Sequence, residues 1–305
     1  MFLQHILDNV YYLPGPSNVG LVVGEAQQAF LIDTGVGRRS GRQILQVLEE
    51  HGLHLVAILN THSHGDHVGG NAYLVEHTGA RVYAPLYDSI VLQQPLWGTL
   101  CLFGGAEPIA ELRTPRFAAE PCDVDVVVTA GPLQVAGVEV EVVPLPGHTG
   151  THTGYIVGEV FFTGDSLAGD AELANSAISY AYSVSKSLES LQQLRRYSCA
   201  RYVPGHGTPE NDITSLVERN IARLTDVMSF VKGYLTSSRR ENASDDGVEA
   251  GEILKAVCER YGIEIRTVRQ YFLLYPTLHS FLSHLSNNGE ISYCVVDNRL
   301  LWRAA

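Results

Sequence analysis

The stretch Thr61-His62-Ser63-His64-Gly65-Asp66-His67 places three imidazoles and one carboxylate within six residues. Neutral imidazole nitrogens and carboxylate oxygens are the ligands that borderline divalent metals such as zinc prefer. Without a cation, groups of this kind so close together would repel one another or have no role. A loop with surplus histidines is the alternative, and it is disfavoured because chance rarely produces ligand spacing this dense. The stretch therefore predicts a metal site.

The geometry of this stretch favours two metals. Residues 55–60, just before it, form a short apolar run that is typical of a buried strand leading into a loop. In an extended segment His62 and His64 point to the same side, and the glycine that follows lets the chain turn before Asp66 and His67. One pair can face one metal and the other pair a second. A helical His-Glu-x-x-His spacing would instead give a single zinc.

Three further ligand candidates each follow an apolar run and a glycine. They are His148 after residues 145–147, Asp165 after residues 161–164, and His206 after residues 203–205. Glycine lets the backbone turn sharply at the end of a strand, so each side chain can be aimed at the same edge of a sheet. A single Pro-Gly-His sequence would be an ordinary turn. Together with the histidine cluster, the three motifs predict one shared metal centre.

The ordered motifs resemble those of the metallo-β-lactamase fold superfamily. The similarity covers roughly residues 1–210 and includes residues 31–35, Leu-Ile-Asp-Thr-Gly, ahead of the cluster. Residues 61–71, which end in Gly-Gly-Asn, are similar to the matching block of hydroxyacylglutathione hydrolases. The resemblance implies an α/β fold, a four-layer αββα sandwich with a small C-terminal unit. It is specific to the fold but not to a substrate.

The resemblance also implies a role for each motif residue. The first metal would be bound by His62, His64 and His148, and the second by Asp66, His67 and His206, with Asp165 bridging them. Asp33 would orient ligands instead of binding metal, although a turn at a strand end explains an aspartate there equally well. The expected cofactors are two divalent metal ions, zinc first, with iron or manganese as alternatives.

One motif departs from the family pattern. After the second motif's histidine many relatives read His-Thr-x-Gly-His, whereas this chain reads His148-Thr149-Gly150-Thr151-His152, with the glycine one place earlier. The turn beside the metal is therefore expected to differ in shape. His152 is expected to form structural hydrogen bonds and to stay out of the metal coordination.

Length and composition fit an intracellular enzyme. The chain has 305 residues and 45% hydrophobic content, enough for one large domain or for a large and a small one. No apolar run approaches the ~18 residues of a membrane-spanning helix, and the N-terminus lacks a secretory signal pattern. Five cysteines without a Cys-x-x-Cys pair indicate reduced thiols, and the cytoplasm is the expected compartment.

The charge of the chain disfavours a polyanionic partner. The formal net charge is −12, from 33 acidic and 21 basic residues. Nucleic-acid binding usually needs a basic surface that releases counterions from the phosphates. A small-molecule substrate is therefore expected, with neither nucleic acid nor a membrane as a partner.

Hydrophobic periodicity predicts a mixture of strands and helices. Short apolar runs between glycine and proline turns predict antiparallel strands in residues 10–33, and an apolar face predicts a helix over 42–51. Further strands are expected at 124–128, 133–143 and 155–162, and a further helix over 185–197.

Residues 86–121 form an aromatic segment, rich in proline and glycine, between the first and second metal motifs. We interpret it as a lid or pocket wall, with Trp97 as a substrate contact and with Arg113 and Arg116 as anchors for an anionic group. A second wall is expected from Tyr180, Tyr182 and Lys186. A dimer contact or an apolar brace on the sheet explains the segment equally well, so a homodimer stays open.

The sequence changes character after the last metal motif. The predicted domains are a catalytic domain over 1–210, connecting helices and a linker over 211–240, and a C-terminal unit over 241–305. Residues 211–236 are expected to be helical, 237–247 to be a polar linker, and Asp297-Asn298 to turn a terminal hairpin. The pattern resembles a winged helix. Six basic residues against nine acidic ones in 241–305 favour packing or dimerisation over DNA binding.

The expected function is hydrolysis of a small ester-like bond, a thioester or a lactone. Two divalent metals would hold a bridging hydroxide that attacks the carbonyl, with Asp66 steering it and passing a proton to the leaving group. The alternatives are a persulfide dioxygenase-like enzyme with one iron at His62, His148 and Asp165, a metal-dependent nuclease, and a non-catalytic binding module held together by metal. β-Lactams are disfavoured because secretion would be expected for that role. A flavodiiron protein is disfavoured because such proteins typically carry an acidic residue at the position of His64.

Overall fold

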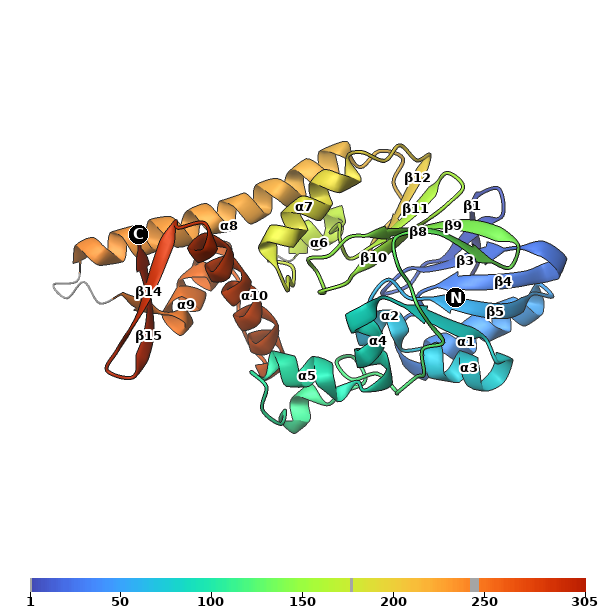
Figure 1. Cartoon of the computed structure of the whole chain (residues 1–305), viewed down its shortest axis with the longest axis horizontal. Helices are drawn as coiled ribbons and strands as arrows, with labels where there is room; N and C mark the ends of the chain where they lie inside the picture. Colours follow the sequence, from blue (N-terminus) through green and yellow to red (C-terminus); the bar gives the residue numbers. More distant parts are fainter. Residues whose placement is uncertain (1, 176–177, 242–246) are drawn as a thin grey trace.

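The computed structural model describes residues 2–175, 178–241 and 247–305, and it contains two large sheets packed face to face with helices on both outer surfaces (Figure 1). The seven-stranded sheet has the order β1-β2-β3-β4-β5-β6-β7, and the five-stranded sheet has the order β12-β11-β10-β9-β8. The four-layer α/β sandwich expected from the sequence is confirmed.

The first sheet is antiparallel from β1 to β4 and parallel from β4 to β7. Its strands are β1 (Gln4–Leu7), β2 (Val10–Leu13), β3 (Val19–Val23), β4 (Gln28–Ile32), β5 (His54–Leu59), β6 (Arg81–Ala84) and β7 (Val126–Val127). On or beside it lie the 3-10 turn η1 (Glu25–Gln27), α1 (Gly37–Glu50), α2 (Gly65–Val68), α3 (Asn71–Thr78), α4 (Leu86–Gln93), α5 (Leu96–Leu102) and the 3-10 turn η2 (Ala110–Leu112).

The second sheet is an antiparallel run to which one parallel strand is added at the edge. Its strands are β8 (Gly131–Val135), β9 (Val138–Pro144), β10 (Thr153–Val157), β11 (Val160–Gly164) and β12 (Arg201–Pro204). The helices of this half are α6 (Asp170–Asn175), α7 (Val184–Leu194) and the long α8 (Thr214–Glu241).

The core between the sheets follows the two-residue alternation of strand side chains. Phe30 and Ile32 of β4 are buried in one cluster with Tyr155 and Phe162 of the second sheet. Leu31, which lies between them in the sequence, is buried on the other face against α1. The sheet is therefore buried on both faces, which holds the strand ends in fixed positions.

The ends of β4, β5, β9, β11 and β12 meet at one edge of the sandwich, where the two sheets are bonded directly. The Tyr155 hydroxyl donates to Asn60 O at 2.8 Å, and Thr153 N donates to Thr61 O at 2.9 Å. Asn18, just before β3, donates through its backbone to Gly205 O at 2.8 Å. All the ligand motifs expected from the sequence lie at this edge, in loops and in the short helix α2, which contains Asp66 and His67.

Two of the predicted strands are in fact hairpins. The run predicted over 133–143 divides into β8 and β9 around Ala136 and Gly137, which have φ values of 53° and 77°. The run predicted over 155–162 divides into β10 and β11 around Gly158, with φ 55°. The strand predicted at 124–128 is only two residues long as β7. The helices predicted over 42–51 and 185–197 are present as α1 and α7.

The predicted linker over 237–247 is wrong in its first part. Residues 237–241 continue α8, and residues 242–246 lie outside the described residues. The hydroxyls of Ser237 and Ser238 both donate to Tyr234 O at 2.9 Å, so these polar side chains bond back onto the helix instead of ending it.

The C-terminal part folds as two helices and a small sheet. They are β13 (Val248–Glu249), α9 (Ala250–Tyr261), α10 (Val268–Asn287), β14 (Ile291–Val296) and β15 (Arg299–Ala304), with the sheet order β13-β15-β14. The predicted hairpin turn is confirmed, because Asp297 and Asn298 have φ values of 49° and 62° between β14 and β15.

This C-terminal part shares a core with the helices of the second sheet. Val184 of α7 and Val231 of α8 are buried in the same cluster as Ile253, Phe281 and Trp302. The domain boundaries predicted from the sequence stay a prediction. Within the described ranges, no helix is both long and apolar enough to cross a membrane.

Candidate metal centre

The loops at the shared edge bring seven potential ligands into two adjacent groups. One group is His62, His64, His148 and Asp165, and the other is Asp66, His67 and His206; within each group the ligand atoms lie within 4.8 Å of one another. Each group draws side chains from loops of both sheets. This is the arrangement that could hold two metal ions side by side.

Asp165 lies between the two groups. Its Oδ1 is 3.3 Å from His67 Nε2, and its Oδ2 is 3.4 Å from both His148 Nε2 and His206 Nε2. His206 Nε2 is also 3.4 Å from His67 Nε2. One carboxylate therefore faces histidines of both groups, as a bridging ligand would.

The donor atoms fit divalent cations. His62 is fully buried, and its Nε2 has no hydrogen-bond partner among the described residues, while its Nδ1 lies 3.0 Å from Thr61 Oγ1. His148 Nε2 lies 2.9 Å from His64 Nδ1, although His148 already has its Nδ1 at 3.1 Å from Tyr180 O. A cation between these nitrogens satisfies lone pairs that the protein alone leaves facing one another.

Burial and neighbouring charges divide the histidines into two kinds. Burial, together with the neighbouring imidazoles, lowers the pKa of His62 and of His148 well below the ordinary value, and burial lowers the pKa of His64. These three rings are neutral at pH 7, which is the form that binds metal.

The second group carries the protons of the centre. Burial lowers the pKa of His67, but Asp165 and Asp33 outweigh it and raise that pKa well above the ordinary value. Burial likewise lowers the pKa of His206, yet its hydrogen bond to Asp165 and the charge of that group raise the pKa to about 9. Bound cations would take the place of these protons beside Asp165.

Backbone and carboxylate acceptors fix the orientation of the second group. Asp33 Oδ2 accepts from His67 Nδ1 at 2.8 Å and from Thr61 Oγ1 at 2.8 Å, and Asp33 Oδ1 accepts from Thr61 N at 2.8 Å. His206 Nδ1 donates to Pro16 O at 2.6 Å. In His67 and in His206 the contact occupies Nδ1 and leaves Nε2 pointing to the centre.

Two glycines are required by close packing around the ligands. A Cβ at Gly205 would collide with Asp165 Oδ1. A Cβ at Gly65 would collide with the carbonyl oxygen of Pro115 and crowd that of Arg116, which come from the segment over 86–121. The end of that segment therefore lies directly on the loop that carries the histidine cluster.

Asp88 of α4 is a functional residue that the sequence motifs did not indicate. It is buried, its Oδ1 accepts from Ser63 N and Oγ at 2.9 and 2.8 Å, and its Oδ2 accepts from Thr149 and Thr151 Oγ1 at 3.1 and 2.7 Å. One carboxylate thus ties the His64 loop to the His148 loop. The two threonines around the displaced glycine are the only sequence signal of this contact.

His152 and Glu172 also lie near the centre. His152 is fully buried, and its Nε2 accepts from Asp165 N at 3.0 Å, so it holds Asp165 in place through the backbone. Burial raises the pKa of Glu172, whose Oε1 accepts from Ser179 Oγ at 2.8 Å. No motif in the sequence pointed to Glu172.

The side chains expected to contact substrate are placed at different distances from the centre. Tyr180 packs edge-on against His64 and His148, with ring centroids 5.4 and 5.6 Å away. Arg116 Nη2 lies 3.9 Å from Asp66 Oδ2. Arg113 is engaged within its own segment, at 2.6 Å from Glu107 Oε1 and 2.8 Å from Pro108 O.

The remaining three are solvent-exposed. Trp97 on α5 is 53% exposed and Tyr182 is 56% exposed. Tyr182 lies next to Gly150, as does Tyr87 at the start of α4, so both rings stand beside the His148 loop. Lys186 in the first turn of α7 is exposed, and its backbone N–H bonds to Ser183 Oγ.

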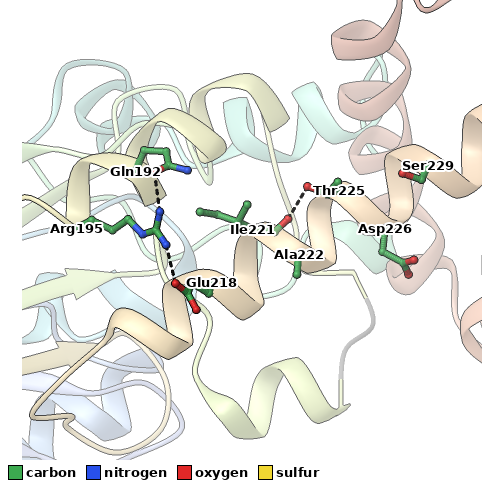
Figure 2. A pocket seen from close by; sticks show the side chains of 8 residues that line it. All are labelled: Gln192, Arg195, Glu218, Ile221, Ala222, Thr225, Asp226 and Ser229. Carbon is green, nitrogen blue, oxygen red and sulfur yellow. Dashed lines mark hydrogen bonds and ion pairs between the residues drawn. The ribbon is translucent and has the colours of Figure 1, made fainter.

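An open groove lies away from the metal centre, on the outer side of α7 and α8, and is lined by Arg195, Glu218, Ala222 and Asp226 among others (Figure 2). Arg195 there is paired with Glu218 at 2.9 Å and with Gln192 at 3.2 Å. A second, inner pocket begins at His148 and Asp165 and runs between α7 and α8.

Comparisons with known proteins agree with this architecture. Residues 12–206 match the family model described as the metallo-beta-lactamase superfamily. The chain is 27% identical to an atrochrysone carboxyl ACP thioesterase of Aspergillus fumigatus over 290 residues, which are 93% of this chain and 60% of that protein. It is 24% identical over 288 residues to a second protein of that name from Aspergillus aculeatus, covering 93% of this chain and 80% of that one.

Two solved structures match almost the whole chain. A metallo-beta-lactamase family protein of Thermus thermophilus has a TM-score of 0.73 at 23% identity, covering 97% of this chain and 99% of that one. A beta-lactamase domain protein of Burkholderia ambifaria has a TM-score of 0.76 at 17% identity, covering 99% and 95%. The likeness in fold therefore includes the C-terminal helices and sheet.

Proposed function

The chain belongs to the metallo-beta-lactamase superfamily and is a metal-dependent hydrolase, and we propose that it hydrolyses an acyl thioester with two divalent metal ions, zinc first among them. The observation that carries the proposal is the convergence of the two ligand groups around Asp165. Relatives matched over 93% of this chain are described as acyl-carrier-protein thioesterases, which supports a thioester over a lactone.

The proposed ligands are the two groups already described, with Asp165 shared between them. Divalent ions held there would supply a deprotonated water at neutral pH and polarise the substrate carbonyl. The protein's own part is to orient the rings: Asp33, Pro16 O and Tyr180 O each bond to the Nδ1 of one histidine, which leaves its Nε2 to face the ions.

Asp66 is the residue that we propose moves the proton. Its side chain is 16% exposed and faces the more open side, where His206 is 28% exposed and Arg116 is 70% exposed. Asp66 Oδ2 would receive the proton of the attacking water and hand it to the departing sulfur. The water oxygen forms the new bond to the carbonyl carbon, the C–S bond breaks, and the products are a thiol and a carboxylic acid, which loses the second proton of the water to solvent.

A thioester needs little help from an acid at the leaving group. A thiol has a pKa near 8.5, so the sulfur leaves readily as a thiolate. The acidic surface of the chain, at −12 formal charge, supports a substrate other than a polyanion such as RNA or DNA. The pantetheine arm next to the thioester is uncharged in coenzyme A and in acyl carriers, so the reacting end of such a substrate meets no such repulsion.

The test is a metal-dependence assay on purified full-length protein. The protein is stripped with a chelator, reloaded separately with Zn²⁺, Mn²⁺ or Fe²⁺, and assayed for thiol release from acetyl- and butanoyl-coenzyme A. The same preparations are tested with a lactone, bis(p-nitrophenyl) phosphate, and glutathione persulfide with oxygen consumption. We expect thioester turnover only after reloading. Equal activity in the stripped protein, or turnover of only one of the other substrates, would reject the proposal.

A further inference from the structure

An apolar pocket opens directly from the metal centre. It has a volume of about 50 Å³, begins at His148 and Asp165, and continues inward between α7 and α8. Its inner wall is made by Leu191, Val227 and Phe281, which are 2%, 1% and 1% exposed. Phe281 comes from α10, so the C-terminal helices supply part of the wall.

Four of the polar side chains that line this pocket are bonded to the protein, and one of them is Arg223, whose Nη2 donates to Leu173 O at 3.5 Å. Asn220 holds both Ala168 N and Ala168 O, at 3.1 and 2.9 Å. Ser190 Oγ donates to Pro146 O at 2.6 Å, and Ser179 Oγ donates to Glu172. A polar ligand would therefore find few free partners deep in the pocket, whereas an apolar group loses nothing by entering it.

The wall around Phe281 is buried, whereas on another side the pocket reaches the metal centre, where the side chains of His148 and Asp165 are 11% and 12% exposed. The thiol portion of a carrier-bound or coenzyme thioester is long and polar and must reach solvent. The acyl portion is the part of the substrate that can end against the buried apolar wall around Phe281.

Resting on the proposed thioesterase function, we propose that this pocket binds the acyl chain of the substrate and that α8 and α10 set its length. The volume is about a third of that of an apolar cavity that holds benzene, so it takes about two or three carbon atoms beyond the carbonyl. Each methylene group that fits improves kcat/KM by about fourfold. The preferred acyl group is therefore short, near butanoyl.

Leu224 of α8 allows a direct test, because it lines this pocket while Ala222, two residues away on the same helix, lines the outer groove (Figure 2). The variants are Leu224→Trp, which fills the pocket, Leu224→Ala, which enlarges it, and the matched control Ala222→Trp. Each metal-loaded protein is assayed with coenzyme A thioesters from acetyl to decanoyl. We expect L224W to keep acetyl turnover and lose at least tenfold in kcat/KM for butanoyl, L224A to prefer longer chains, and A222W to match the parent.

A binding measurement separates this inference from the proposed function. Calorimetric titration of the metal-loaded proteins with straight-chain carboxylates from acetate to decanoate reports on the pocket without turnover. If no thioester is cleaved but the parent binds butanoate more tightly than acetate and L224W does not, the acyl pocket stands and the thioesterase proposal fails. If thioesters are cleaved with the same length profile in the parent, L224W and L224A, the pocket is rejected and the thioesterase proposal stands. Absence of both turnover and length-dependent binding rejects both.

Discussion

At the scale of single residues, the carboxylate of Asp33 decides which nitrogen of His67 faces the metals. It accepts from His67 Nδ1 and from two donors of Thr61, so it can act only as an acceptor. An Asn side chain of the same shape would turn one N–H toward these donors. Contacts of this kind behind a metal ligand typically change metal affinity by about 10- to 100-fold.

We therefore expect Asp33→Asn to weaken metal binding by about 10- to 100-fold and to reduce hydrolysis in the same proportion. Competition with a chromophoric chelator measures the affinity. Asp297→Asn, in the distant hairpin turn, is the control and should bind metal like the parent. Unchanged affinity in the Asp33 variant would show that the carboxylate does not orient the ligand.

The second residue-scale prediction concerns Asp66. Replacing it with Asn keeps an oxygen that can face the metals but removes the group that accepts a proton. We expect kcat at saturating metal to fall by about 10²- to 10⁴-fold, because the group that transfers the proton is lost. The exposed Asp8, changed to Asn in the same way, is the control. A variant with parental kcat at saturating metal would remove Asp66 from the proton transfer.

The sequence indicated the ligand set because those residues sit in short motifs that follow apolar runs, and strand ends on one sheet edge must meet. It could not indicate Asp88, because its partners Thr149 and Thr151 are more than sixty positions away and a lone aspartate in a helix has many uses. It also could not tell Arg116, beside Asp66, from Arg113, which pairs with its neighbour Glu107.

At the scale of elements, the segment over 86–121 is held between the metal loop and the C-terminal helix α10. Its end packs on Gly65, and Phe103 after α5 contacts Phe272 of α10 with ring centroids 5.0 Å apart. Figure 1 shows α5 beside the N-terminal end of α10, the end that carries Phe272. The segment is thus braced near its C-terminal end and at its middle, and α10 is the outer support.

Loss of that support should loosen the segment. We expect Phe272→Ala to raise KM for a thioester by about threefold to tenfold, the value of one aromatic contact, with a smaller change in kcat. Limited proteolysis should cut within residues 104–109 faster than in the parent. Tyr293→Ala, on the exposed hairpin strand, serves as the comparison. If both variants have parental KM and proteolysis rates, the contact does not support the segment.

Secondary structure was predictable where the apolar periodicity extends over many residues, as in α1. It was less predictable where the apolar pattern runs on through a turn. Ala136 is a non-glycine residue at positive φ, and its neighbours continue the apolar alternation, so Gly137 is the single mark of the turn between β8 and β9. The predicted linker at the end of α8 failed for the opposite reason: the polar sequence suggested a break that is absent. The hydroxyls of its serines bond to a backbone oxygen of the helix itself, so the helix continues.

At the scale of the whole molecule, the C-terminal helices and sheet are built into the same core as α7 and α8. The chain has two tryptophans, Trp97 in α5 and Trp302 in the small sheet. In the Trp97→Phe variant the remaining fluorescence reports on the C-terminal sheet alone. Because the core is shared, we expect this signal and the far-ultraviolet circular dichroism to change at the same urea concentration.

The denaturation is followed with metal bound, and the parent protein is the control for the substitution. A fluorescence midpoint well below the dichroism midpoint would mean that the C-terminal part unfolds on its own. In that case the position of Phe281 in the wall of the inner pocket would not depend on the stability of the sandwich.

Each ligand group takes side chains from both halves of the sandwich: residues 62–67 follow β5, whereas His148, Asp165 and His206 follow strands of the other sheet. Neither half alone offers a complete coordination sphere. During folding, therefore, the ions can be captured tightly only after the halves have docked, and from then on they act as two cross-links between them. Chelation should release those cross-links first at this edge, so amide hydrogens of the ligand loops would exchange sooner than those of the buried strands behind them.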